Sequence, residues 1–305
     1  MSGGTKISFI GFGEAAQAFA TGLLGENAQA EMRAFDIKTS GPEAAAKRDD
    51  YRRHGVTGTP TCAEACEDRD VIFSLVTAEQ AEHAAIAASD ADLDGALFLD
   101  CNSCAPNTKR RAAGIVEGAG GRYVDVAIMT PVHPRLHKSP CLLAGPHASA
   151  ADDICKMLGM KVEAAGQTVG AASTRKMIRS TMIKGLEALT LECFLAARKA
   201  GIEDDILASL ETSFPGFGWE SRAPYMMERV ATHGIRRAAE MEEVAKTLID
   251  LGIEPHVTRG TIARQREVGA LGLDLNQTDD QDIATRADAL LEGLASISSD
   301  INSED

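Results

Sequence analysis

The chain has 305 residues, which is enough for two domains and a sizeable buried core. Hydrophobic residues make up 44% of it and charged residues 25%, as in ordinary globular proteins. The formal net charge of −14 argues against a nucleic-acid partner, which would need a basic surface. We find no signal peptide and no apolar run long enough to span a bilayer, so we expect a cytoplasmic protein without a membrane partner.

The seven cysteines are an odd number in a chain without a secretory signal, so we expect reduced thiols. Cys101 and Cys104 have the Cys-x-x-Cys spacing, and Cys62 with Cys66 is the only other cluster. A zinc site would need a second ligand pair, and neither cluster has a nearby pair of histidines. We interpret these residues as loop thiols and predict no metal, with a metal or redox role as the alternative.

A strand, a glycine turn and a helix open the chain. The apolar run Ile7–Ile10 leads into a Gly-x-Gly-x-x-Ala turn that ends at Ala16. Gly11 permits the tight turn, and Gly13 lets a pyrophosphate approach the backbone at the positive end of the helix. The alternative is an ordinary tight turn between a strand and a helix. We predict that a dinucleotide binds at this turn, through Gly11, Phe12, Gly13, Glu14 and Ala15.

Asp36 closes the second apolar run, twenty residues after Ala16. An acidic residue at this distance accepts hydrogen bonds from the adenosine ribose and repels a 2′-phosphate, which favours NAD. Lys38, Thr39 and Ser40 follow directly and could cradle such a phosphate. NADP therefore stays the alternative cofactor.

Further apolar runs alternate with helical segments, which predicts a doubly wound parallel sheet. Such a sheet binds its ligands at the carboxyl ends of the strands. Two more strands end further along the chain, after the glycine turn. Thr77, directly after the first of them, is also expected to cap the helix that follows it. We predict cofactor contacts from these two strand ends, through Val76, Thr77, Asn102 and Ser103.

After Gly166 the pattern is helical, and we find no convincing strand. One long helix is predicted from Ser173 to about Ala200, with Gly201 as its C-cap. Shorter helices are predicted at residues 203–213, about 222–232, 234–251, 256–271 and 281–298, with Asp280 capping the last. The predicted fold is an N-terminal Rossmann domain (residues 1–168) followed by an all-helical substrate and dimerisation domain (residues 169–305).

Lys176 lies on the first turns of the long helix, six residues after Gly170. Ser180, Lys184 and Glu187 lie near it on the same stripe at helical spacings. For a lysine on a helix the plain interpretation is a solvated charge. The start of this helix at the predicted domain boundary instead favours a place in the ligand crevice. Lys184 lies roughly 12 Å further along the helix axis, so the two lysines cannot act on the same bond.

The chain resembles the β-hydroxyacid dehydrogenase superfamily, which includes 3-hydroxyisobutyrate, tartronate semialdehyde and 6-phosphogluconate dehydrogenases and imine reductases. It looks closest to the branch with a 6-phosphogluconate dehydrogenase C-terminal-like domain. Residues Phe9–Ala16 match the family's cofactor loop, and Asp100–Pro106 match its Asp-x-Ser-Thr-x-x-Pro loop beside the nicotinamide. Gly170–Ser180 match Gly-x-Gly-x-x-x-Lys-x-x-Asn-Asn at the outer Gly and at the Lys. The resemblance implies that Lys176 is the catalytic residue, that Ser180 contacts substrate and that the protein is a homodimer.

The family's substrate loop, Asp-Ala-Pro-Val-Ser-Gly-Gly, corresponds here to Asp125–Pro131. The resemblance therefore places Met129 and Thr130 at the substrate, without the Ser-Gly-Gly backbone. His133 and Arg135 follow, and each suits an anionic substrate. The alternative is a Pro-rich crossover with a solvated arginine.

The predicted function is that of an NAD(P)-dependent oxidoreductase. Hydride moves between the nicotinamide and a small or medium hydroxy acid or its oxo counterpart, and Lys176 is the general acid or base. The expected partners are this substrate, which is expected to be anionic, and a second copy of the chain. The alternatives are an imine reductase, a decarboxylating sugar-acid dehydrogenase and a protein that senses NAD(P)H without turnover.

Overall fold

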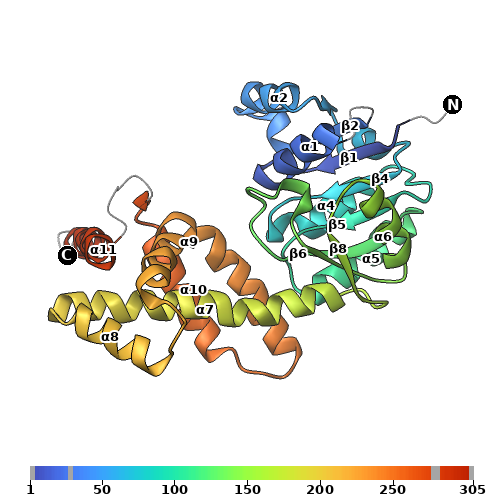
Figure 1. The fold of residues 1–305 in the computed structure, drawn as a ribbon. Helices are drawn as coiled ribbons and strands as arrows, with labels where there is room; N and C mark the ends of the chain where they lie inside the picture. The colour runs from blue at the N-terminus through green and yellow to red at the C-terminus, as the bar shows by residue number, and fades with distance from the viewer. Residues whose placement is uncertain (1–3, 27–29, 276–281, 302–305) are drawn as a thin grey trace. The chain divides into compact units, whose positions relative to one another are not determined.

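The computed structural model describes residues 4–26, 30–275 and 282–301 (Figure 1). The chain forms two compact units, Met1–Met177 and Ile178–Asp305, which we describe separately. The predicted domain boundary at residues 168 and 169 stays a prediction. Among the described residues no helix has the length and apolar character needed to cross a membrane.

The first unit is built on one sheet with the strand order β3-β2-β1-β4-β5-β6-β7-β8. Its strands are β1 Lys6–Ile10, β2 Glu31–Phe35, β3 Thr57–Gly58, β4 Val71–Ser74, β5 Leu97–Asp100, β6 Arg122–Ile128, β7 Cys141–Ala144 and β8 Val162–Gly166. Its helices are α1 Glu14–Glu26, α2 Ala44–Arg53, α3 Cys62–Cys66, α4 Ala81–Ala88, α5 Pro106–Gly118 and α6 Ala148–Met157. Short 3-10 turns occur at η1 Ile37–Ser40, η2 Ala78–Gln80 and η3 Leu136–Lys138.

The predicted Rossmann sheet is confirmed, with one exception in strand direction. All neighbouring strands run parallel except β6 and β7, which pair antiparallel with Ile128 opposite Cys141. The connection between these two strands holds only the short turn η3. A parallel pair needs a longer crossover, usually through a helix, so the chain returns antiparallel here.

The central strands are buried on both faces, which explains their nearly continuous apolar sequence. Successive residues of a strand point to opposite faces. Accordingly, Phe9 packs in one hydrophobic cluster with Phe19 and Phe73, whereas Ile10 packs in a second cluster with Phe98. Helices therefore cover both faces of the sheet.

The helix α7, Ala171–Ala200, is the predicted long helix, and it runs without interruption (Figure 1). Its first turn packs against the last strands of the sheet through small side chains. Ala172 lies in a cluster with Ala127, Ala144 and Ala165, which lets the helix approach the sheet closely. Gly201 has a φ of +69° and ends the helix as predicted.

The second unit contains only helices among its described residues. After the rest of α7 come α8 Glu203–Ser213, α9 Trp219–Asp250, α10 His256–Gly269 and α11 Ile283–Ile301. Leu191 and Phe194 of α7 pack against Met227 and Val230 of α9 and Leu290 of α11 in its core. The all-helical character predicted for this half is confirmed.

The predicted break between helices at residues 232 and 234 is wrong, because α9 continues through it. Gly234 serves a helix crossing instead. A Cβ atom on Gly234 would lie 2.2 Å from the carbonyl oxygen of Gln265, so α10 approaches α9 with no room for a side chain. The predicted cap Asp280 lies outside the described residues. Asp282 caps α11 in the structure, since its Oδ1 accepts a hydrogen bond of 2.6 Å from the N–H of Thr285.

Candidate functional site

The two glycines of the first turn have different structural roles. Gly11 has a φ of +81°, and a Cβ there would lie 2.6 Å from the carbonyl oxygen of Leu75. Only glycine suits this position. A Cβ on Gly13, by contrast, would meet nothing within 4 Å, so the space beside this residue is open. The structure therefore leaves room for a ligand at the second glycine.

The N-terminus of α1 provides an anion site beside that space. The first hydrogen bond of the helix runs from the N–H of Gln17 to the carbonyl of Gly13, at 3.0 Å. The N–H groups of Glu14, Ala15 and Ala16 consequently have no acceptor within the helix. They point with the positive end of the helix dipole, which favours a phosphate. The turn and the helix together fit the pyrophosphate of a dinucleotide.

Phe12, between the two glycines, holds the turn against the core of the first unit. Its side chain is fully buried, with its ring centroid 5.9 Å from that of Phe9 and 5.0 Å from that of Tyr51. Its carbonyl accepts a hydrogen bond of 2.8 Å from Lys47 Nζ, and its N–H donates to Asp36 Oδ2 at 2.8 Å. Phe12 holds the turn in place through both its side chain and its backbone.

Asp36 lies at the end of β2, where it accepts two backbone hydrogen bonds. Besides the N–H of Phe12, the N–H of Lys38 donates to Asp36 Oδ1 at 2.9 Å and makes this aspartate the N-cap of η1. The neighbouring lysine side chains are already paired. Lys38 Nζ lies 2.9 Å from Glu43 Oε2, and hydrogen bonding to Glu43 raises the pKa of Lys38. Lys47 Nζ lies 2.9 Å from Asp50 Oδ2.

The structure brings the predicted strand ends together with the glycine turn. A Cβ on Gly11 would lie 2.7 Å from Val76 Cγ1, and the N–H of Val76 donates to Asn102 Oδ1 at 2.7 Å. Asn102 is buried and also donates from Nδ2 to Ser74 Oγ at 2.9 Å. Its amide thus ties the end of β4 to the end of β5.

Two other predicted cofactor residues, Thr77 and Ser103, directly follow Val76 and Asn102 in the chain. Thr77 is exposed, and its side chain makes no capping hydrogen bond to η2, so its predicted capping role is wrong. Ser103 Oγ is buried, and we find no hydrogen-bond partner for it within residues 4–26, 30–275 and 282–301.

A buried cluster of charges lies behind these strand ends. Lys109 is fully buried, and its Nζ donates to the carbonyl of Asp100 at 2.5 Å and to Asp100 Oδ1 at 2.9 Å. The same ammonium lies 3.7 Å from Asp125 Oδ1. Burial opposes its charge, but the two carboxylates prevail and raise the pKa of Lys109. Tyr123 completes the cluster, since its hydroxyl donates to Asp100 Oδ2 at 2.6 Å.

Asp125 fastens the start of α7 to β6. Its Oδ2 accepts hydrogen bonds from the N–H groups of Gly170 at 3.0 Å and Ser173 at 3.1 Å, and its Oδ1 accepts one from Ser173 Oγ at 2.5 Å. Gly170 has a φ of +98°, and a Cβ there would lie 3.0 Å from Pro106 Cβ at the start of α5. Sequence reasoning missed this role. The available signal was a carboxylate inside the apolar run Tyr123–Ile128.

Lys176 follows Ser173 on α7 and is half-buried in the first unit. Burial raises the pKa of Cys141 to about 12, and the nearby Lys176 ammonium opposes this shift. Cys141 pairs with Ile128 at the end of β6, and the N–H of Met129 donates to the carbonyl of Pro140 at 2.8 Å. Lys176 therefore lies near the strand end that carries Met129 and Thr130.

The other candidates on α7 belong to the second unit. Ser180 is buried there, as is Lys184. Lys184 Nζ lies 2.5 Å from Glu240 Oε2 on α9. Burial lowers the pKa of Lys184, and Glu240 opposes the shift. Lys184 is thus a buried ion-pair partner and not a solvated charge.

His133 and Arg135 lie on the connection between β6 and β7, and both are exposed. Among the described residues no carboxylate forms an ion pair with Arg135. The same connection is held to α1 by His137, whose Nε2 lies 3.3 Å from Glu26 Oε2. Gly22 makes room for this ring, because a Cβ there would lie 2.0 Å from His137 Nδ1.

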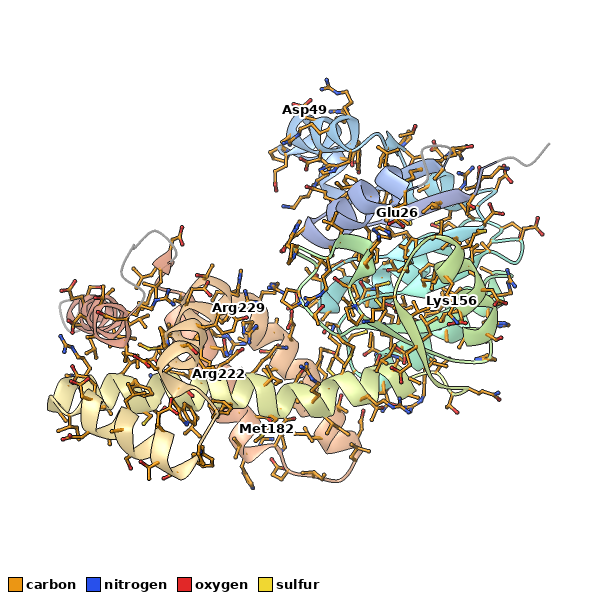
Figure 2. All side chains as sticks on the ribbon, in the orientation of Figure 1. Glu26, Asp49, Lys156, Met182, Arg222 and Arg229 are labelled. Atoms are coloured by element: carbon orange, nitrogen blue, oxygen red, sulfur yellow. The ribbon has the colours of Figure 1, made fainter. Side chains whose placement is uncertain are left out.

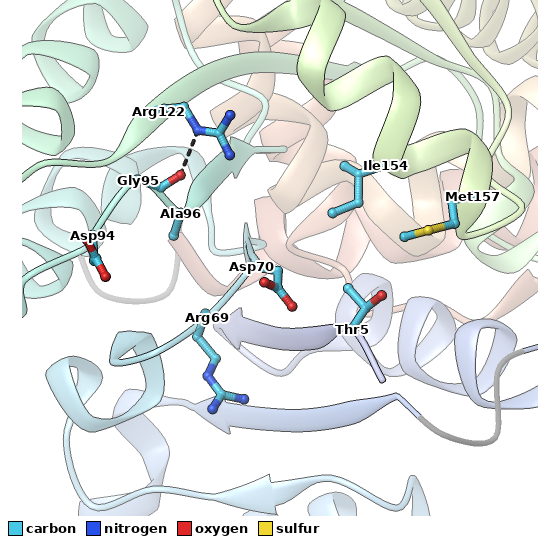
Figure 3. Close-up of a pocket in the computed structure, with 9 residues that line it drawn as sticks. All are labelled: Thr5, Arg69, Asp70, Asp94, Gly95, Ala96, Arg122, Ile154 and Met157. Carbon is cyan, nitrogen blue, oxygen red and sulfur yellow. Dashed lines mark hydrogen bonds between the residues drawn. The ribbon is translucent and has the colours of Figure 1, made fainter. Parts of the chain in front are cut away.

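A separate pocket of about 460 Å³ lies at the amino ends of β1, β4, β5 and β6 (Figure 3). Its lining includes Arg69, Asp70, Asp94 and Arg122. Arg122 Nε donates to the carbonyl of Gly95 at 2.6 Å, the bond drawn in Figure 3. The predicted cofactor residues instead follow the carboxyl ends of the strands, so this pocket is not part of their site.

Cys101 and Cys104 lie in the loop between β5 and α5, as predicted, whereas Cys62 and Cys66 lie at the two ends of α3 and are not loop thiols. Cys62, Cys66, Cys101 and Cys104 are all buried. Packing against apolar neighbours accounts for them, as for buried cysteines in general. In the described ranges, no three His, Cys, Asp or Glu side chains are grouped to hold a metal ion.

Known families match both parts of the chain. Residues 6–103, which include the glycine turn and Asp36, match the family described as NADP oxidoreductase, coenzyme F420-dependent. Residues 197–268 match a domain of unknown function (DUF1932). The first unit therefore has the nicotinamide-binding fold of an oxidoreductase.

Similar proteins match over most of the chain. A conserved hypothetical protein from Sinorhizobium meliloti 1021 is 37% identical, with a TM-score of 0.75 over 96% of this chain and 98% of its own. A conserved protein of unknown function, described as similar in structure to 3-hydroxyacid dehydrogenases, is 29% identical, with a TM-score of 0.69 over 87% of this chain and 97% of its own. The 3-hydroxyisobutyrate dehydrogenase of Pseudomonas aeruginosa is 24% identical over 222 residues, 70% of this chain and 72% of that protein. The glycine turn, the helical second unit and these matches agree: the chain belongs to the β-hydroxyacid dehydrogenase superfamily.

Proposed function

We propose that this protein is an NAD-dependent dehydrogenase of small or medium hydroxy acids, or a reductase of their oxo counterparts. The bound nicotinamide supplies the hydride chemistry. In oxidation, Lys176 takes the proton of the substrate hydroxyl as the carbon-bound hydrogen leaves as hydride. In reduction, it returns that proton to the carbonyl oxygen.

The observation that carries this proposal is the place of Lys176 within the first unit. The charge of its ammonium opposes the raised pKa of Cys141, which pairs with the end of β6. The first turn of its helix is fastened to β6 by Asp125 and touches the start of α5, directly after the loop of Asn102. One lysine thus lies close to the segments proposed for the nicotinamide and for the substrate.

The choice of NAD rests on the charges around Asp36. Its carboxylate is fixed by two backbone donors, and each oxygen keeps a lone pair for a ribose hydroxyl. Lys38 and Lys47 are already paired with Glu43 and Asp50, so they offer a 2′-phosphate little additional attraction. A fixed negative charge whose neighbouring lysines Lys38 and Lys47 are already paired favours the cofactor that lacks the phosphate.

The substrate is proposed to be anionic. Arg135 and His133 are exposed on the connection that begins at Met129 and Thr130, and Arg135 has no ion-pair partner among the described residues. A guanidinium without a partner suits a carboxylate. Ser180, one turn beyond Lys176 on α7, is proposed as a further substrate contact.

A homodimer is proposed from the apolar surface of the second unit. Ile178, Met182 and Leu189 lie on one stripe of α7 and are 49%, 70% and 66% exposed, with Met182 labelled in Figure 2. Exposed apolar stripes of this kind mark contacts with another chain. Light scattering at micromolar concentration is expected to report a dimer, and a monomer would contradict the proposal.

The experiment that tests the function is a panel of hydroxy acids with NAD and NADP and of cyclic imines with NADH and NADPH, followed by the absorbance of the reduced nicotinamide, together with a measurement of NADH binding. Turnover of a hydroxy acid with retention of its carbon chain supports the proposal. Release of carbon dioxide indicates a decarboxylating enzyme, and turnover restricted to cyclic imines indicates an imine reductase. Tight binding of NADH without any turnover indicates a sensing protein, and each of these three results overturns the proposal.

A further inference from the structure

The buried charge cluster of the first unit joins the three segments of the proposed site. Asp100 ends β5 directly before the loop of Asn102 and Ser103. Asp125 lies in β6, whose end leads into Met129. Lys109 lies between the two carboxylates, at 2.9 Å from one and 3.7 Å from the other. Because Asp125 also caps α7, the same cluster reaches the helix that carries Lys176.

We propose that Asp125 is a positioning residue for proton transfer by Lys176. By holding the first turn of α7 to β6, it sets the place of the lysine relative to the loop of Asn102. This inference rests on the proposed function, because it takes the lysine as the group that moves the proton.

The strength of the attachment supports this role. Three donors converge on one carboxylate: the N–H groups of Gly170 and Ser173 and the hydroxyl of Ser173. Hydrogen bonds to an ionised acceptor are roughly twice as strong as neutral ones. The negative charge also lies at the positive end of the α7 dipole, which adds to the attraction. Asp125 therefore attaches the first turn of α7 firmly to β6.

The geometry transmits this attachment to the lysine. Lys176 follows Ser173 by three residues, so it lies about 4.5 Å further along the helix at 1.5 Å per residue. A shift of the first turn therefore moves the lysine by a similar distance. A misplacement of about 1 Å at a reacting group can cost on the order of 10²-fold in rate.

Lys109 reduces the cost of burying the charged carboxylate of Asp125. Asp125 is 0% exposed, and a buried carboxylate is costly unless it has a cation and hydrogen bonds. The lysine provides the charge without touching the acceptor sites that the α7 backbone occupies. The attachment thus combines a neutralising cation on one side with backbone donors on the other.

The first test is the variant Asp125→Asn, which removes the charge but keeps one acceptor oxygen. With the hydroxy acid found in the panel, kcat is expected to fall about 10- to 100-fold because the lysine is displaced. The Kd for NADH, measured by fluorescence, should change less than about twofold, since the glycine turn is not touched. Unchanged kcat, or equal losses in kcat and NADH affinity, would overturn the proposal.

The matched control is Thr174→Ala. Thr174 lies on the same turn of α7, and its hydroxyl donates to the carbonyl of Gly170 at 2.7 Å, whereas the donors to Asp125 are Gly170 and Ser173. Its kcat is expected to stay within about twofold of the parent enzyme, as for most substitutions away from a reacting group. A loss as large as that of Asp125→Asn would show that any disturbance of this turn suffices, and would overturn the specific role of the aspartate.

A double variant separates positioning from general support of the fold. If Asp125 acts through Lys176, adding Asp125→Asn to Lys176→Ala should cause no further loss of kcat/KM. A further loss of the full size seen in the parent background would overturn the proposal. Failure of the proposed function gives a different result, because Lys176→Ala alone would then keep its turnover.

A measurement without substrate keeps the inference testable if the panel finds no turnover. With NADH bound, the protein is treated with acetic anhydride, and acetylation of Lys176 is compared by mass spectrometry with that of the exposed Lys199 on the same helix. Asp125→Asn should raise the relative rate at Lys176 about threefold or more, because local opening of the first turn exposes it. An unchanged relative rate would overturn the proposal.

Discussion

Asp125 in the first unit and Glu187 in the second are both buried carboxylates, but different groups neutralise them. Asp125 is bound by backbone N–H groups at the start of α7, with Lys109 behind it. Glu187 lies within α7 and forms an ion pair with Arg237 of α9, side chain to side chain. A backbone attachment fixes a helix start at one place, whereas a pair of long side chains can follow small shifts of the helices. The first arrangement therefore suits the positioning of chemistry, and the second suits helix packing.

The two units also differ in how completely their buried polar groups are hydrogen-bonded. Every oxygen of Asp100 and Asp125 has a donor. In the second unit, by contrast, neither amide atom of the fully buried Gln265 has a hydrogen-bond partner within the described part of the chain. A cluster with all its bonds made is rigid. We expect the first unit to hold its charges in one arrangement and the second to tolerate more than one.

The strongest test of this comparison is Lys176→Ala. Loss of a general acid or base costs roughly 10²–10⁴-fold, so kcat should fall in that range while NADH still binds. Lys184→Ala lies two turns further along α7 and serves as the second-unit counterpart. Because Lys184 pairs with Glu240, its loss should lower Tm and leave kcat nearly unchanged.

If Lys184→Ala abolishes turnover and Lys176→Ala does not, the proton carrier is misassigned. If neither variant does, His133 becomes the next candidate.

The next largest effect is expected on stability, from Arg237→Ala. Removing one partner of a buried ion pair leaves an uncompensated charge and costs about 3–5 kcal/mol. Thermal unfolding followed by circular dichroism should show a clear fall in Tm. The control is the double variant Glu187→Leu with Arg237→Met, which removes both charges and should recover most of the loss. No recovery would mean that the pair does more than balance charge and also fixes how α7 and α9 pack.

Asp36 resembles Asp125 in accepting backbone N–H groups, but it is partly exposed and faces the proposed ribose. Asp36→Asn keeps an acceptor for the turn while removing the charge. The ratio of kcat/KM for NAD over NADP should fall about tenfold, because the repulsion of a 2′-phosphate is lost. Lys38→Ala breaks only an exposed ion pair and should change the ratio less than about twofold. A tenfold preference of the parent enzyme for NADP would reverse the cofactor assignment.

The smallest effect is expected at His137, a side-chain pair like that of Glu187 but in the first unit. Burial lowers the pKa of His137 from its ordinary 6.5, and Glu26 opposes the shift. The unfolded chain therefore takes up the proton first, so this contribution to stability is full above about pH 6.5 and is lost as pH falls below it. The Tm of His137→Gln should depend less steeply on pH between 7.5 and 5.5 than that of the parent protein.

His54, whose pKa burial also lowers, keeps part of the slope in both proteins. Glu26 has a lowered pKa and titrates below this window, so it does not interfere. A steeper slope in His137→Gln would mean that the imidazole is stabilised in its charged form by Glu26.

The sequence predicted the features that depend on neighbours in the chain. Gly11, Gly13 and the start of α1 form one local unit, and so does the end of α7 at Gly201. The sequence did not reveal the roles of Asp125 and Lys109, because their partners lie far away in the chain. The aspartate accepts from Gly170 across 45 residues, and no local pattern reports such a contact.

The same reason explains two errors about secondary structure. Gly234 suggests a break when only its own helix propensity is considered. Its actual role appears only when α10 lies against it. The antiparallel direction of β7 likewise depends on where the short connection after Met129 can place the chain. The elements β3, α3 and α6 carry too little local pattern to be predicted.

The crossing of α9 and α10 limits how this protein can change. A Cβ on Gly234 would lie 2.2 Å from a backbone oxygen of Gln265, and a Cβ on Gly269 would lie 2.5 Å from the backbone nitrogen of Ile235. A clash between side chains can be repaired by a smaller side chain at a second site. Here the obstructing atoms are main chain, which every residue possesses. A mutation at either glycine therefore has no second-site suppressor within this contact, and only reversion or a shift of a whole helix restores the fold.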